Sequence, residues 1–74
     1  MTERRISEAT KGRVRAALPA ADDRGWMARQ VHAAVEDLSH HTIRAALRAL
    51  VVEGRAQRSG RFAAYRYRLA GPWA

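Results

Sequence analysis

Cysteine is absent from the 74 residues, and its absence excludes a disulfide framework, a thiolate metal site and a cysteine nucleophile. Long apolar runs are also missing, since none reaches the roughly 18 residues of a membrane span. The charged residues 1–6 lead into no apolar signal-peptide core. We therefore expect a cytoplasmic protein that makes no membrane contact.

Catalytic and metal-binding groups are sparse as well. Ser7, Ser39 and Ser59 have no plausible base beside them, and no glycine-rich loop could cradle a phosphate. Zinc prefers four ligands, and three histidines without cysteine make such a site improbable. The sequence thus predicts no enzyme, no metal site and no cofactor.

Acidic residues are scarce in the second half of the chain. Residues 39–74 hold seven arginines against Glu53 alone, a net charge of +6, whereas residues 1–38 hold seven basic and six acidic residues, a net charge of +1. A GC-rich genome would explain why Lys11 is the only lysine, but it would not explain this asymmetry. A surplus of positive charge favours a polyanionic partner, most simply nucleic acid.

The chain is short enough to form one domain, over 1–74, with residues 1–6 frayed and residues 70–74 as a tail. A chain of this size buries only about 60% of its unfolded surface, so we expect a thin core. A first helix is predicted to start at Ser7 or Thr10 and to end before Pro19. Its apolar stripe contains Ile6, Thr10, Val14 and Leu18.

Two further helices are predicted, over 28–35 and after Ser39. Ser39 is a strong N-cap candidate, and Gly54 supplies a left-handed C-terminal cap. Between them, one apolar face is formed by Ile43, Ala46, Leu47, Leu50 and Val51.

After Gly54 the spacing of the apolar residues changes from a helical period to alternation. Tyr65, Tyr67 and Leu69 alternate with Arg66 and Arg68, which is typical of a half-buried strand. Residues 56–58 are the expected partner strand, and residues 59–63 are the expected turn, with Gly60 available for positive φ. The segment around Trp26 could add a third strand.

The stretch from Trp26 to Leu69 resembles the winged helix-turn-helix domains of bacterial GntR- and MarR-type regulators. The resemblance lies in Thr42-Ile43-Arg44, Ala46-Leu47, Leu50, Glu53-Gly54 and residues 65–69. It implies an α+β fold of three helices followed by a C-terminal β-hairpin wing. The chain departs from the family where Met27-Ala28 replaces the usual Ser or Thr at the start of the second helix, and where Arg55 replaces an aliphatic residue.

The resemblance also implies which residues meet double-stranded DNA. The third helix would lie in the major groove and the wing would contact the flanking backbone. Carried onto this sequence, the DNA-binding residues are His40, His41, Thr42, Arg44, Ala45, Arg48, Arg58 and Arg61.

Several side chains keep more than one interpretation. One of His40 and His41 could contact DNA while the other is only solvated. Tyr65 and Tyr67 could stack on bases, although core packing is favoured, and the alternation leaves open which face Arg66 and Arg68 occupy. Phe62 could enter a groove, pack under the wing or be exposed, and Trp73 could fold back on the first helix, join a dimer or be exposed.

The leading hypothesis is sequence-specific binding of double-stranded DNA by a transcriptional regulator. Because one small module buries only about 600–1,000 Å² on DNA, a homodimer or several copies on repeated sites is a subsidiary hypothesis. Two alternatives are a guidance module like the gamma domains of FtsK-type and plasmid-transfer translocases, and a winged-helix module that binds another protein.

Overall fold

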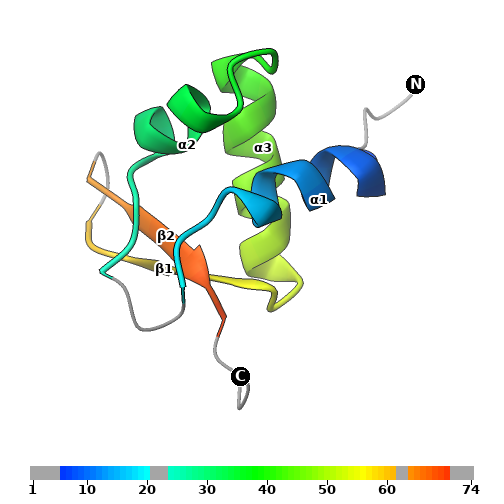
Figure 1. The fold of residues 1–74 in the computed structure, drawn as a ribbon. Coiled ribbons are helices and arrows are strands. Elements are labelled where there is room, and N and C mark those ends of the chain that lie inside the picture. The colour runs from blue at the N-terminus through cyan, green and yellow to red at the C-terminus, as the bar shows by residue number, and fades with distance from the viewer. Residues whose placement is uncertain (1–5, 21–23, 62–63, 71–74) are drawn as a thin grey trace.

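The computed structural model describes residues 6–20, 24–61 and 64–70, so the predictions for Phe62 and Trp73 lie outside the described residues. Three helices are followed by an antiparallel hairpin (Figure 1). The elements are α1 Glu8–Ala16, α2 Ala28–Ala34, α3 His40–Val52, β1 Ala56–Ser59 and β2 Arg66–Leu69. The fold is α+β, with the layout of a winged helix-turn-helix whose wing is the β1–β2 hairpin.

The central element is α3, which contacts α1, α2 and β1. Its apolar face is fully buried at Ile43, Ala46, Leu47 and Leu50, and it packs against Val14 of α1 and Val31 of α2. Each large apolar side chain that is fully buried in this way contributes about 1.5–3 kcal/mol. The opposite face of α3 is thereby held outward.

The helix ends follow the predicted capping signals. The Oγ atoms of Ser7 and Ser39 accept hydrogen bonds from the backbone N–H groups of Thr10 and Thr42, each at 3.1 Å. Gly54 follows α3 with a φ of 79°, as expected of a left-handed cap. Met27 makes no side-chain cap for α2, but the Gln30 Oε1 atom accepts from the Met27 N–H at 2.8 Å. The Gln30 side chain therefore provides one of the hydrogen bonds at this helix start, where a serine or threonine cap is missing.

The hairpin is fastened to the chain before α2. Ala56 pairs with Leu69 and Arg58 pairs with Tyr67 across the two strands. On the other edge of β2, Trp26 and Tyr67 exchange two backbone hydrogen bonds, of 2.9 and 2.8 Å. The Trp26 segment thus adds a single bridge rather than the third strand that the sequence suggested.

Gly25 allows this close approach. Its φ is 98°, and a Cβ atom there would lie 3.0 Å from the Tyr67 carbonyl oxygen. Both the positive φ and the lack of space favour glycine at this position.

Several predicted boundaries were wrong by one residue or a few. The first helix ends before Pro19, as predicted, but already stops at Ala16. Val35 is the C-cap of α2, Ser59 belongs to β1, and β2 begins only at Arg66. Ile6, expected to fray, packs partly buried against the core. Within the described part of the chain, no helix is long and apolar enough to cross a membrane.

Candidate nucleic-acid interface

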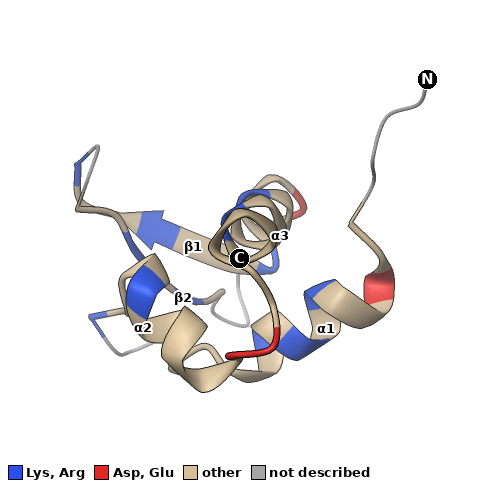
Figure 2. Ribbon diagram, turned by 90° about the horizontal axis from the view of Figure 1, so that it is seen from above, with Lys and Arg blue, Asp and Glu red and all other residues tan. Residues whose placement is uncertain are grey.

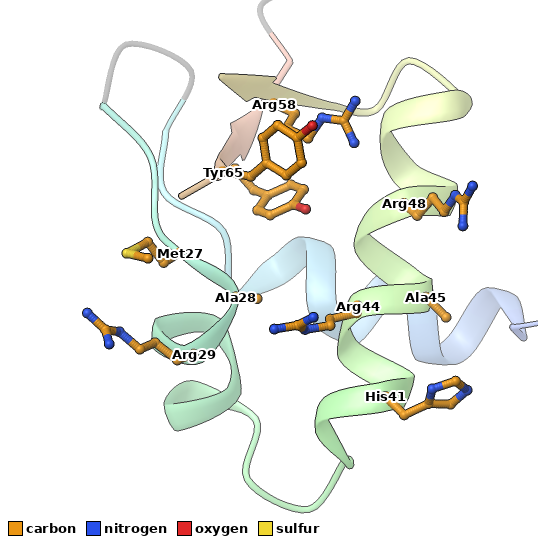
Figure 3. A pocket seen from close by; sticks show the side chains of 10 residues that line it. Met27, Ala28, Arg29, His41, Arg44, Ala45, Arg48, Arg58 and Tyr65 are labelled. Carbon is orange, nitrogen blue, oxygen red and sulfur yellow. The ribbon is translucent and has the colours of Figure 1, made fainter. Parts of the chain in front are cut away.

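A groove of about 590 Å³ lies between the start of α2, the outward face of α3 and the hairpin. Figure 3 shows Arg44 reaching from α3 toward α2, below the hairpin. Four cations and two tyrosines are among its lining residues, which are Met27, Ala28, Arg29, His41, Arg44, Ala45, Arg48, Arg58, Tyr65 and Tyr67. The groove therefore combines positive charge with aromatic and apolar walls.

The outward face of α3 contributes the residues expected of a reading helix. His41, Arg44, Ala45 and Arg48 all line the groove. Arg44 and Arg48 are exposed and one helical turn apart, and the side chain of neither makes a hydrogen bond or ion pair with another described residue. Their guanidinium groups are free to bind an external acceptor.

His40 and Thr42 were predicted to contact DNA, but neither lines the groove. The ring of His40 lies against the ring of His32 from α2, with centroids 3.9 Å apart and planes tilted by 33°. Thr42 donates its backbone N–H to Ser39, and its Oγ1 accepts from the Ser39 hydroxyl at 3.0 Å. Of the two adjacent histidines, His41 is therefore the one that faces the groove.

The two faces of the hairpin separate its arginines. Arg58 shares one face with Tyr65 and Tyr67 and lines the groove. Arg66 and Arg68 occupy the other face, where Arg66 donates to the Gly25 carbonyl oxygen at 3.0 Å and Arg68 donates to Ser59 Oγ at 3.4 Å. The structure thus settles the face of Arg66 and Arg68: Arg68 links the two strands, and Arg66 links the hairpin to the segment before α2.

Arg61 stands apart from the groove. It follows β1 at the outer end of the hairpin and is exposed. Its backbone carbonyl accepts from the Ala64 N–H at 2.8 Å, but its side chain makes no hydrogen bond or ion pair with a described residue. Of the two hairpin arginines predicted to contact DNA, the structure brings only Arg58 beside α3.

The described acidic residues lie away from the groove, at the start of α1, in the turn between α2 and α3 and after α3 (Figure 2). Glu8 and Glu53 both bind Lys11, whose Nζ lies 2.9 Å from Glu8 Oε2. Asp37 binds Arg13 at 2.6 Å. Lys11 and Arg13 of α1 are therefore neutralised by neighbours, whereas no described acid pairs with Arg15 or with the arginines of the groove.

These ion pairs change the titration of their members. The hydrogen bond from Lys11 lowers the pKa of Glu8, and the hydrogen bond from Arg13 lowers the pKa of Asp37. The hydrogen bond to Glu53 raises the pKa of Lys11. Each shift favours the charged form, so the pairs persist at neutral pH.

Sequence reasoning did not single out Met27, Ala28 and Arg29 as site residues. They lie at the start of α2, where Arg29 is exposed and makes no ion pair with a described residue. Its position in the first turn of a helix expected to pack across the third helix was the available signal. The tyrosines were seen, but their part in the groove depends on how the hairpin packs against α3.

Comparison of the chain with protein-family models, with curated proteins and with solved structures gives no match.

Proposed function

We propose that this protein binds double-stranded DNA, with α3 in the major groove and the hairpin against the flanking backbone. The observation that supports this most strongly is the separation of the charges. Arg29, Arg44, Arg48 and Arg58 line one groove and have no acidic partner among the described residues, whereas the acids near α1 pair with Lys11, Arg13 and Arg55.

The dimensions of α3 and of the major groove of B-DNA are compatible. A helix of α3's length spans about 20 Å, and the major groove of B-DNA, about 12 Å wide, admits an α-helix. Arg44 and Arg48 can then present planar pairs of donors to guanine edges or to phosphates. Ala45 lies between them and offers a methyl group to apolar base edges.

Within DNA binding, we favour transcriptional regulation through a specific site. This step rests on fold-level analogy, because regulators are frequent users of the winged helix. The single module offers a small contact area, so a specific site would be read by two copies, as a homodimer or on repeated sequences.

The test is to titrate the protein with a random-sequence duplex over a range of salt concentrations. We expect the logarithm of the binding constant to fall linearly with the logarithm of the salt concentration, with a slope of about −0.9 for each phosphate neutralised. Absence of binding at low salt would contradict the proposal, and the groove would then be better explained as a surface for an acidic protein.

A further inference from the structure

The guanidinium of Arg58 lies over an aromatic ring. Its Cζ atom is 4.2 Å from the centroid of the Tyr65 ring, well within the roughly 6 Å at which a cation is attracted to a ring face. Figure 3 shows the two side chains together at the hairpin end of the groove, with the guanidinium directed toward α3.

The strand register explains why this pair forms. Arg58 of β1 is directly opposite Tyr67 of β2, so Tyr65, two residues earlier, is its diagonal neighbour on the same face. Diagonal pairs of this kind are within reach of aromatic and long side chains. Tyr65 is half-buried whereas Arg58 is exposed, so the ring is the fixed partner and the guanidinium is the one that it holds.

The backbone beneath the pair is also held. Arg68 ties β2 to Ser59 of β1, and Arg66 ties β2 to the Gly25 carbonyl. Arg61 provides a contrast, since it lies two residues beyond the end of β1 and its side chain has no partner among the described residues. The hairpin thus carries one arginine that is oriented before binding and another that is not.

We propose that Tyr65 is a positioning residue for DNA binding, which holds the Arg58 guanidinium over the groove so that it meets a backbone phosphate. This inference rests on the proposed function. An unrestrained arginine loses much rotamer freedom when it binds, and orienting the side chain beforehand reduces that cost. Tyr65 therefore raises affinity through Arg58, without touching DNA itself.

A double-mutant cycle tests the proposal, with a fluorescent random-sequence duplex as the probe at constant low salt. Tyr65→Leu should weaken binding about two- to fivefold when Arg58 is present, and should have no further effect in the Arg58→Ala background. Tyr65→Phe keeps the ring face and should bind like the wild type. In the matched cycle with Arg61→Ala, the effects of Tyr65→Leu and Arg61→Ala should simply add.

Each other result overturns the inference in a recognisable way. Additive effects of Tyr65→Leu and Arg58→Ala would mean that the ring contacts DNA directly. If the effect of Tyr65→Leu on affinity is coupled equally to Arg58→Ala and to Arg61→Ala, Tyr65 only stabilises the hairpin. A thermal melt of Tyr65→Leu would then show a loss of stability. If the wild type binds no duplex, the proposed function itself fails, whereas normal binding by every Tyr65 variant removes the inference alone.

Discussion

Lys11, in the middle of α1, donates a hydrogen bond to Glu53, the residue that caps the end of α3. The lysine side chain is only 8% exposed, and its Nζ also contacts Glu8. This link fixes α1 across the back of α3 and occupies the only acid among residues 39–74. The outward face of α3 is thereby left with unopposed positive charge.

The Lys11 ion pairs predict a dependence of stability on pH. Since the pKa of Glu8 is lowered by folding, its contribution is present above the ordinary value of 4.5 and is lost as pH falls through the folded-state value. Since the pKa of Lys11 is raised, its contribution is present below 10.5 and is lost as pH rises through its folded-state value. We expect a plateau of unfolding free energy between these limits.

Lys11→Met should flatten both ends of that profile, measured by urea unfolding over a series of pH values. The control is Arg15→Met, because Arg15 is exposed on the same helix and pairs with no described residue. Identical pH profiles for the wild type and Lys11→Met would show that the buried ion pair does not make the unfolding free energy depend on pH.

Gly25 and Gly12 predict opposite effects of the same substitution. Gly25→Ala places a Cβ atom against Tyr67 at a positive φ and should cost roughly 1–3 kcal/mol of unfolding free energy. Gly12→Ala meets no atom within 4 Å on an exposed helix face and should stabilise the protein by about 0.5–1 kcal/mol. Chemical denaturation of both variants checks this, and a neutral Gly25→Ala would refute the close approach of the Trp26 segment to β2.

Ser39 should stabilise α3 through its hydroxyl. Ser39→Ala removes the acceptor for the Thr42 N–H and should lower the unfolding free energy by about 1 kcal/mol. Ser39→Asp keeps an acceptor and should restore most of that loss. If the Ser39→Asp variant is as destabilised as the Ser39→Ala variant in thermal melts, loss of the N-cap hydrogen bond is not the cause of the destabilisation.

Arg44 and Arg48 should determine base preference once preferred sites have been selected from a random DNA pool. Loss of a guanine contact through Arg44→Ala or Arg48→Ala should cost about 1–3 kcal/mol, roughly five- to 150-fold in affinity. Arg15→Ala carries the same charge change outside the groove and should leave the base preference unaltered. Unchanged site preference in both groove variants would show that α3 does not read DNA.

The sequence was sufficient where the signals are local. Ser39 and Gly54 mark the start and end of α3, and the apolar spacing identifies Ile43, Leu47 and Leu50 as core residues. Arg44 and Arg48 follow from the same helical geometry, because they occupy the opposite face. Such features depend on residues only a few positions apart.

The remaining features depend on distant partners, which periodicity cannot identify. Lys11 can be buried because its ammonium group is paired with the carboxylate of Glu53, 42 residues later. The His40 ring lies against His32 of another helix, so its place in the first turn of α3 gave no warning. Similarly, strand alternation grouped Arg66 with Arg68, but only the contact with Gly25 shows which side of the hairpin they occupy.

The most direct test of the central claim is to map amide and arginine side-chain NMR resonances while a DNA duplex is added. We predict that the changes concentrate at residues 41–48 of α3, at Arg29 and at Arg58, while residues 8–16 of α1 stay unperturbed. Changes centred on α1, or no changes at low salt, would contradict the assignment of the α2–α3–hairpin groove as a DNA-binding surface.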